Sequence, residues 1–290
     1  MFVVIVWGLN FVAIKYAFQE WDVKAIATLR YLLMLPLMFW MAAVLKQTVK
    51  LSKGEHLKHY LAGFMSSGLY MVFFLEGMDR VGAAQGAVCL ATAPLWVSLF
   101  AVVTKIEKFR WTLVFGGLLS YLGVATVILA GTGERHWTPL GLALVLISAM
   151  IWAWSIIMMR PLLIDRPALG VFTATFPGAA IIMVPYGVIP MIQTDFTAIT
   201  WIGWSALAYL VVLAGAGAFA SYYIGIKAVG PQQASMTQYF VPIVAALGAW
   251  GLRGEPMNLI QGLGVFGVLL GVWWAKQGAL PPNPDPEVAT

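Results

Sequence analysis

The stretch PLGLALVLISAMIWAWSIIMM, residues 139–159, carries no charged side chain until Arg160 follows it. A helix that crosses a bilayer needs about 20 consecutive, largely apolar residues, because the hydrocarbon core is about 30 Å thick. Ser148 and Ser155 are the hydroxyl-bearing residues of the stretch, and the others are apolar or aromatic. Residues 139–159 are therefore predicted to form a transmembrane helix.

The whole chain has the composition of a membrane protein. Of its 290 residues, 61% are hydrophobic and 10% are charged, and the mean hydropathy is +0.86. Soluble domains carry about 25% charged residues, so too few polar side chains are present here to coat a soluble fold. A lipid bilayer is the expected surrounding, and the inner membrane of the cell is the expected location.

Further apolar stretches of similar kind precede and follow the first. They predict an all-α polytopic protein with ten transmembrane helices, at residues 2–17, 25–45, 58–77, 82–104, 111–130, 139–159, 168–190, 201–226, 232–252 and 259–276. The breaks between them fall at charged or Pro/Gly turns, as at 254–256. The tail 277–290 is rich in proline from Pro281 onward and is expected to be disordered.

The distribution of Lys and Arg predicts the orientation. With the N-terminus in the cytoplasm, the inside segments hold Lys46, Lys50, Lys53, Lys58, Lys105, Lys108, Arg110, Arg160, Arg166, Lys227 and Lys276. The outside loops then hold Lys24, Arg80, Arg135 and Arg253. Cytoplasmic loops carry an excess of Lys and Arg, so both termini are predicted to be cytoplasmic.

The basic character of the chain does not point to nucleic acid. The net charge is +5, but the basic residues lie in short loops between apolar stretches. Nucleic-acid binders instead cluster their basic residues on one polar surface. No nucleic-acid partner is expected.

An internal repeat relates the two halves of the chain. Adding 148 to the residue number places several polar or conformationally special residues of the first half on identical ones, without a gap: Gly82 on Gly230, Gln85 on Gln233, Pro94 on Pro242, Glu107 on Glu255, Gly116 on Gly264 and Gly123 on Gly271. Near the start of each half, Trp7, Asn10 and Lys15 correspond to Trp152, Ser155 and Arg160 at an offset of 145. Five helices in each half give the halves opposite orientations, so the sequence predicts two inverted five-helix repeats, 1–131 and 138–276.

These motifs resemble the drug/metabolite transporter superfamily in its ten-helix EamA-type branch. The resemblance rests on Trp7-Gly8-x-Asn10-Phe11-x3-Lys15, on Arg30, on Pro94 followed by Glu107, and on residues 230–256. It implies alternating-access export of small metabolites, with neutral or aromatic amino acids as the nearest match. Many relatives carry Glu before the second proline, where this chain has Val241, so a mechanism that needs that carboxylate is in doubt.

Candidate cavity residues are those that combine hydrogen bonding with depth in a predicted span. They are Asn10, Tyr70, Gln85, Trp152, Ser155, Tyr222 and Tyr239. Polar groups are costly inside a bilayer and usually line a cavity or face a partner helix. Aromatic side chains also gather at membrane interfaces, which is the alternative for the Trp and Tyr residues.

Charged residues and prolines within the spans are the second group of candidates. Lys15, Arg30 and Glu76 are expected at the cavity mouth, where a cation could attract a carboxylate. The alternatives are that Lys15 or Arg30 reaches the interface, or that Glu76 pairs with one of them. Pro94 and Pro242 each remove a helical hydrogen bond and are expected to kink equivalent helices.

Other functional classes have weaker support. The chain has no His-Glu-x-x-His and no Gly-x-Ser-x-Gly motif for a membrane enzyme, and no phosphate-binding Gly-x4-Gly-Lys. A channel would need a filter or a charged ring, which is not evident. No metal or cofactor is expected, the partner is a small-molecule substrate, and the chain is expected to be monomeric. Amino acids, aromatic compounds, sugar derivatives and cationic drugs all remain open as substrates.

Overall fold

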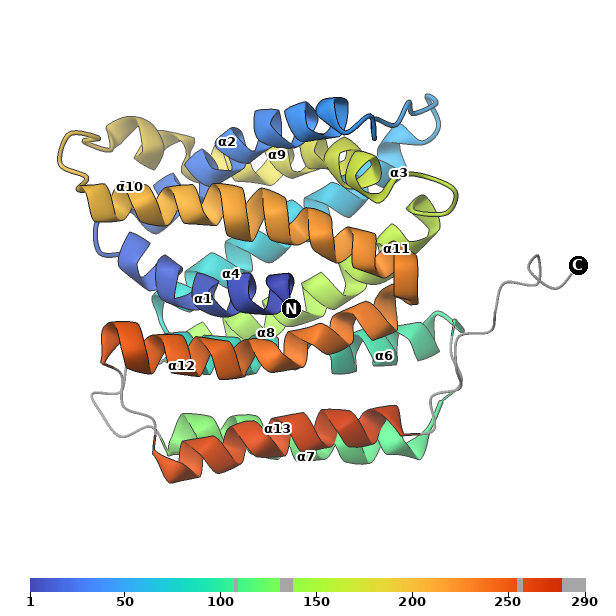
Figure 1. Cartoon of the computed structure of the whole chain (residues 1–290), viewed down its shortest axis with the longest axis vertical. Helices are drawn as coiled ribbons and strands as arrows, with labels where there is room; N and C mark the ends of the chain where they lie inside the picture. The colour runs from blue at the N-terminus through green and yellow to red at the C-terminus, as the bar shows by residue number, and fades with distance from the viewer. Residues whose placement is uncertain (107–108, 131–137, 255–257, 278–290) are drawn as a thin grey trace, which may run out of the picture.

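The computed structural model describes residues 1–106, 109–130, 138–254 and 258–277. Within these ranges it leaves undescribed the side chains of residues 113, 124, 127–129, 230–233, 236, 239, 253 and 276. The predicted tail lies almost wholly outside the described residues. Every regular element in the described ranges is helical (Figure 1).

The helices follow one another along the chain with short connections. They are α1 (Phe2–Ala17), α2 (Val23–Val44), α3 (His56–Gly63), η1 (Phe64–Leu69), α4 (Tyr70–Asp79), α5 (Ala83–Leu90), α6 (Ala93–Val103), α7 (Trp111–Leu129), α8 (Pro139–Met159), η2 (Arg160–Leu162), α9 (Ala168–Gln193), α10 (Trp201–Ala208), η3 (Tyr209–Gly217), α11 (Ala218–Met236), η4 (Thr237–Phe240), α12 (Val241–Arg253) and α13 (Leu259–Lys276).

Helix length and apolarity confirm a polytopic membrane protein. Among the described residues, six continuous helical stretches are long and apolar enough to cross a bilayer. They are Val23–Val44, His56–Asp79, Ala83–Val103, Pro139–Leu162, Ala168–Gln193 and Trp201–Val229. Shorter apolar helices cover Phe2–Ala17, Val114–Gly123, Val241–Leu252 and Leu259–Ala275. Helices satisfy their own backbone hydrogen bonds, which a bilayer interior requires.

Side-chain caps fix where several helices begin. The Asp22 carboxylate accepts hydrogen bonds from the backbone N–H groups of Lys24 and Ala25, and the Thr138 hydroxyl accepts one from Gly141. Asn258 and Gln261 form a reciprocal capping box at the start of α13. Such caps satisfy N–H groups that the first helical turn leaves without partners.

One predicted boundary is wrong. The sequence predicts a break at residues 227–231, between two spans, but α11 runs through them to Met236 and the chain turns in η4. The Gly230-Pro231 pair indicated a turn, and in water it often makes one. Inside a bilayer an open turn leaves backbone groups without partners, so a helix that tolerates one Pro costs less free energy than a loop.

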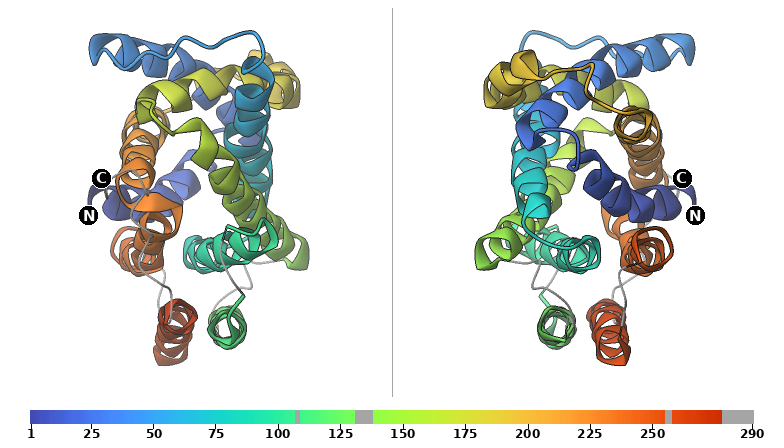
Figure 2. Two further views of the ribbon diagram at one scale, coloured as in Figure 1. Left: turned by 90° about the vertical axis from the view of Figure 1, so that its right-hand side faces the viewer. Right: turned by 90° about the vertical axis from the view of Figure 1, so that its left-hand side faces the viewer.

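Helices α7 and α13 form an antiparallel pair at one edge of the molecule (Figure 2). Their backbones approach closely at Gly116 with Gly271 and at Gly123 with Gly264. Midway between these contacts, the Ser120 hydroxyl donates a hydrogen bond to the carbonyl of Val268 at 3.2 Å. Small residues allow helices to pack closely in membranes, where dispersion and hydrogen bonds drive their association.

The α7–α13 contact supplies a matched pair of variants. A Cβ at Gly116 would overlap with the Gly271 carbonyl oxygen and with Ala275, whereas a Cβ at the neighbouring Gly117 would meet open space. We expect Gly116→Ala to destabilise the protein by about 1–3 kcal/mol, the usual cost of overpacking. Thermal unfolding in detergent should show a lower Tm for Gly116→Ala than for Gly117→Ala. Equal Tm values for the two variants would contradict the described packing.

Candidate functional site

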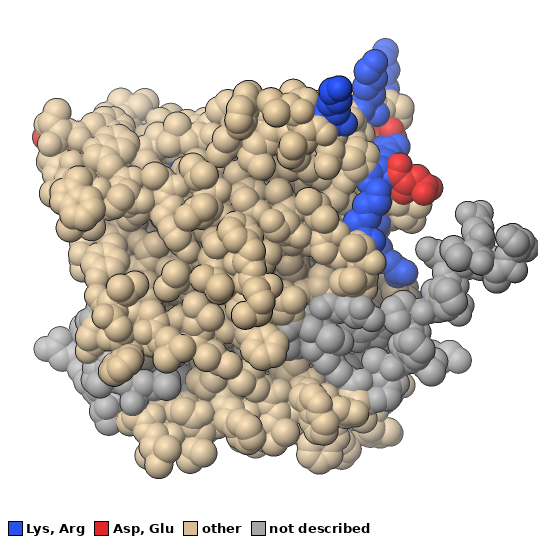
Figure 3. Space-filling view, viewed as in Figure 1, with Lys and Arg blue, Asp and Glu red and all other residues tan. Residues whose placement is uncertain are grey.

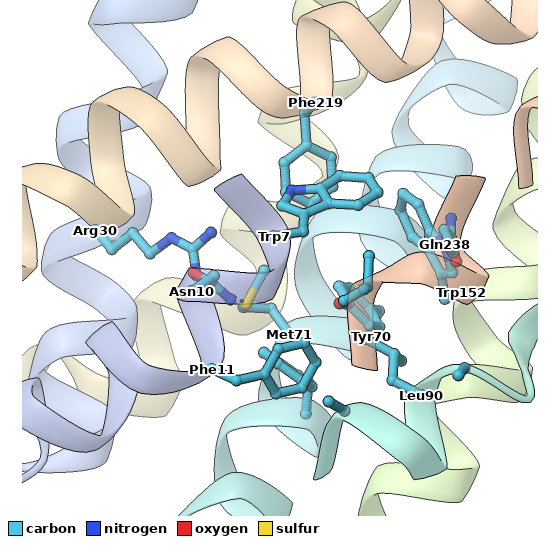
Figure 4. A pocket seen from close by; sticks show the side chains of 14 residues that line it. Trp7, Asn10, Phe11, Arg30, Tyr70, Met71, Leu90, Trp152, Phe219 and Gln238 are labelled. Carbon is cyan, nitrogen blue, oxygen red and sulfur yellow. Dashed lines mark hydrogen bonds between the residues drawn. The ribbon is translucent and has the colours of Figure 1, made fainter. Parts of the chain in front are cut away.

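A narrow cavity lies at the centre of the helical bundle (Figure 4). Its volume for water-sized occupants is about 40 Å³. A single water needs about 10–15 Å³ by this measure, so the cavity has room for about three waters. The lining residues are Trp7, Asn10, Phe11, Arg30, Tyr70, Met71, Phe74, Ala87, Leu90, Ala91, Trp152, Phe219, Gln238 and Val241. A solute larger than a few waters therefore requires the walls to move apart.

Aromatic rings form most of the apolar wall. The Trp7 ring makes edge contacts with Trp152 at 6.0 Å and with Phe219 at 5.2 Å between ring centroids. Trp152 also lies 5.1 Å from Tyr70 and 5.6 Å from Phe219. These spacings fall in the range that aromatic pairs prefer. Because α1, α4, α8 and α11 each contribute a ring, the wall joins four helices.

Irregular backbone lies next to the lining residues. The π-helical segment η1 ends just before Tyr70 and Met71, and the π-helical segment η3 ends shortly before Phe219. A π-helical turn is wider than an α-helical turn and occurs frequently at functional sites. By turning the following residues relative to a regular helix, η1 and η3 determine which of their side chains face the cavity.

The two prolines predicted to kink helices lie at equivalent places in the structure. Pro94 is in the first turn of α6, after α5 has ended at Leu90. Pro242 is in the first turn of α12, after the 3-10 segment η4. Leu90 and Gln238, each four residues before its proline, line the cavity. A proline cannot donate to the carbonyl four residues earlier, so both helices are interrupted beside the cavity.

The predicted cavity residues divide into two groups. Asn10, Tyr70 and Trp152 line the cavity and are less than 10% exposed. Tyr222 contacts the Trp7 and Trp152 rings at 5.0 and 5.7 Å but is not a lining residue. The other three are not lining residues among the side chains described.

Ser155, Gln85 and Tyr239 lie elsewhere or are not described. The Ser155 hydroxyl donates to the Trp152 carbonyl at 2.7 Å, within its own helix. The Gln85 side chain folds against Gly82 at the start of α5. The backbone of Tyr239 belongs to η4, and its side chain is outside the described residues.

The three predicted charges at the cavity mouth also lie in different places. Arg30 lines the cavity itself and is 3% exposed. The Lys15 ammonium donates to the carbonyl of Met78. Glu76 accepts hydrogen bonds from Arg80 at 2.7 Å and from the Tyr186 hydroxyl at 2.6 Å. The acid therefore pairs with Arg80 on its own helix rather than with Lys15 or Arg30.

Several lining residues were not among the sequence candidates. Phe11, Met71, Phe74 and Phe219 are apolar, and apolar character alone does not distinguish a wall residue from a core residue. The internal repeat, however, relates several lining residues of the first half to lining residues of the second half. Trp7 and Trp152 are equivalent at an offset of 145, while Met71 and Phe219, and Leu90 and Gln238, are equivalent at 148, and all six line the cavity.

Polar contacts join the two halves at both ends of the bundle. At one end the Glu55 carboxylate pairs with Arg166, and within the second half the Lys227 ammonium donates to the Arg166 carbonyl. Hydrogen bonds from Ser52 and then from Arg166 lower the pKa of Glu55 to about 2, so its charge persists at neutral pH. At the other end Glu20 accepts from the backbone and hydroxyl of Thr200, both at 2.6 Å.

Comparison with sequence models of protein families shows to which family the chain belongs. The sequence model of the EamA-like transporter family matches residues 1–129 and again residues 139–276. The chain belongs to the EamA-like transporter family. The resemblance inferred from the sequence motifs is thereby confirmed. EamA proteins are transporters, so this chain is a membrane transporter and not a membrane-embedded enzyme.

Individual EamA relatives are similar over most of the chain. The uncharacterized inner membrane transporter YedA of Escherichia coli K12 is 27% identical over 92% of this chain and 87% of its own length. A probable terminal-alkyne amino-acid exporter of Streptantibioticus cattleyicolor is 26% identical over 72% of this chain and 71% of its own. A solved crystal structure superposes with a TM-score of 0.69 over 95% of both chains at 15% identity, which shows a shared fold.

Two aromatic substitutions test whether this EamA cavity carries the solute. Tyr70 and Trp152 line it and contact each other, so truncating either ring removes wall surface from the solute path. An aromatic ring contact is worth about 0.5–1.5 kcal/mol beyond the area that it buries, which is about 2- to 12-fold in affinity. We expect Tyr70→Ala and Trp152→Ala to reduce flux at limiting substrate while the protein still reaches the membrane.

Trp201→Ala is the matched control, because Trp201 is 78% exposed at the start of α10, away from the cavity lining. Its flux should equal that of wild type. Normal flux by both cavity variants, at wild-type expression, would show that Tyr70 and Trp152 only pack the bundle.

Proposed function

We propose that the chain is an inner-membrane exporter of small amphipathic metabolites, above all neutral or aromatic amino acids, that works by alternating access through the central cavity. The observation that carries the proposal is the cavity itself, which has aromatic walls and one guanidinium. Ligand sites combine mainly apolar walls with a few placed polar groups. The names of two relatives, an inner membrane transporter and a probable amino-acid exporter, support the location and the substrate class.

The architecture we propose is ten transmembrane helices in two inverted repeats, residues 1–131 and 138–276. Six long and four shorter apolar helices support the count of ten. The α7–α13 contacts support the inversion: Gly116 meets Gly271 and Gly123 meets Gly264, while the repeat makes Gly116 equivalent to Gly264 and Gly123 to Gly271. Such reciprocal pairing is what a two-fold axis between antiparallel helices produces.

Contacts between the halves at both ends of the bundle support the alternating-access part of the proposal. The Glu55–Arg166 pair and the Glu20–Thr200 hydrogen bonds each join the first half to the second. A cavity of about 40 Å³ between them is too small for an amino acid. Opening one end while keeping the other closed lets the halves rock about a fixed central site.

Orientation is the first part of the proposal to test. Figure 3 shows exposed Lys and Arg side chains gathered along one edge, at the end where α2 leads to α3. That connection carries Lys46, Lys50 and Lys53, all exposed, which supports a cytoplasmic position for this end and for both termini. The chain has one native cysteine, Cys89, and it is buried, so cysteines can be introduced singly.

We expect a cysteine replacing Ala198 to react with a membrane-impermeant maleimide added to intact cells. We expect a cysteine replacing Lys53 to react only after the cells are opened. Both positions are exposed, so burial does not limit either reaction. The reverse pattern would overturn the proposed orientation. Labelling of both cysteines in intact cells would show that positions 53 and 198 do not lie on opposite sides of the membrane.

Transport is the second part to test. Glu76 is held by Arg80 and Tyr186, and position 241 is Val, so no acid is proposed to carry protons. We expect the purified protein in proteoliposomes to exchange labelled phenylalanine for unlabelled phenylalanine with no imposed proton gradient. The exchange should saturate and show counterflow, which a channel does not.

Protein-free liposomes are the control for leakage in this assay. A strict requirement for a proton gradient, abolished in Glu76→Gln, would contradict facilitated transport. Transport of a sugar derivative or a cationic drug, with no movement of neutral amino acids, would overturn the proposed substrate class.

A further inference from the structure

Arg30 is the one charged side chain among the lining residues that the structure describes. It is 3% exposed and lies in the middle of the apolar core. Its Nη1 is 3.4 Å from the Met71 thioether, a weak acceptor, and its Nε has no hydrogen-bond partner within the described part of the chain. A buried arginine normally pairs with a carboxylate or phosphate, which its planar fork fits.

Among the described residues, no Asp or Glu pairs with Arg30. The cavity lining contains no Asp or Glu. Glu76, the acid on the neighbouring α4, is engaged by Arg80 and Tyr186. A buried guanidinium without a counter-charge carries a large desolvation cost, which an incoming anion offsets.

A second polar group lies beside the guanidinium. In Figure 4 the Arg30 side chain extends toward Asn10, and Trp152 and Gln238 lie at the opposite side of the view. Asn10 is 7% exposed, and its Oδ1 has no partner among the described residues. The cavity therefore has a charged end, with Arg30 and Asn10, and an aromatic end around Trp152, where Gln238 adds an uncharged polar group.

The charge comes from one half only. Aromatic wall residues come from both halves, as with Trp7 and Trp152. At the offset of 145, Arg30 corresponds to Thr175 and Asn10 corresponds to Ser155, and neither of these second-half residues lines the cavity. The first half alone supplies the charge, so a bound solute has one preferred direction in the cavity.

We infer that Arg30 binds the carboxylate of the transported solute, and that the cavity selects small carboxylates with an aromatic or apolar tail over amines that lack a carboxylate. The carboxylate lies against the Arg30 fork, and the tail lies among Trp7, Trp152 and Phe219. A free α-amino group, where the solute has one, is within the reach of the unpartnered Asn10 Oδ1. This inference rests on the proposed function, because it names the chemistry of that same site.

Binding to purified protein tests the inference without depending on flux. Trp7 and Trp152 in the wall make intrinsic tryptophan fluorescence a direct readout, with calorimetry as a second one. The probes are phenylalanine, 3-phenylpropionate, which lacks the amine, and phenethylamine, which lacks the carboxylate. We expect both carboxylates to bind at least tenfold more tightly than phenethylamine.

Variants of Arg30 complete the test. Removing a charge-assisted hydrogen bond commonly weakens binding by about 10- to 150-fold, so Arg30→Gln should weaken phenylpropionate binding by that factor and leave phenethylamine unchanged. Arg30→Lys keeps the charge without the bidentate fork and should recover part of the loss. Lys24→Gln is the matched control, because Lys24 is an exposed cation on the same helix.

The outcomes separate this inference from the proposed function. Equal binding of phenethylamine and phenylpropionate by wild type, no carboxylate binding, or full affinity in Arg30→Gln would each overturn the role of Arg30. Should Arg30→Gln fail to fold, the wild-type probe series and Arg30→Lys still decide. Carboxylate binding that depends on Arg30, without flux in proteoliposomes, would support the site and overturn the transport proposal.

Discussion

Backbone groups inside a bilayer find no water to bond with, and the structure of this chain follows from that constraint. Long helices satisfy it along most of the chain. The departures from regular α-helix are concentrated beside the cavity: η1 before Tyr70, η3 before Phe219, and the interruptions that precede Pro94 and Pro242. Irregular backbone is tolerated at membrane depth where it lines a cavity or is buried in protein. The irregular backbone segments alone therefore mark the position of the cavity.

The side chains add an apolar frame that both halves share and a charge that one half supplies. Trp7 and Trp152 touch each other across the bundle and are equivalent in the repeat. A frame built from equivalent residues can keep similar packing when the halves exchange roles during rocking. Arg30 has no charged counterpart, since Thr175 occupies the equivalent position at the offset of 145. In the proposed mechanism, the symmetric frame serves the movement of the halves and the asymmetric charge serves the selection of the solute.

Composition, periodicity and the repeat could predict the membrane fold from the sequence. Each transmembrane helix is recognisable from the length of its own apolar stretch, without knowledge of its neighbours. The sequence could also predict that Asn10, Tyr70 and Trp152 are buried polar or aromatic residues worth testing, and they line the cavity. It could not predict that Ser155 bonds its own helix or that Gln85 folds against Gly82, because those outcomes depend on local geometry.

The cavity position of Arg30 and the C-terminal end of α11 also could not be predicted from the sequence, because both depend on how whole helices pack. An arginine near a span end could reach the interface or the cavity, and only the packing of α2 against α9, η3 and α4 decides which. The turn expected before residue 232 failed for a related reason. Gly-Pro weakens a helix, but whether the helix breaks depends on what would satisfy the freed backbone groups.

The small size of the cavity has different consequences for its charged end and for its aromatic end. A guanidinium has five N–H donors, and a space of about 40 Å³ holds about three waters, so water alone solvates Arg30 poorly in the closed form. A carboxylate presents two oxygens that accept a bidentate pair in the space those waters would fill. An apolar tail gains no comparable contact until the aromatic walls separate. The charged end can therefore accept its ligand group with little rearrangement, while the aromatic end must open, and the proposed movement of the halves is needed mainly for the tail.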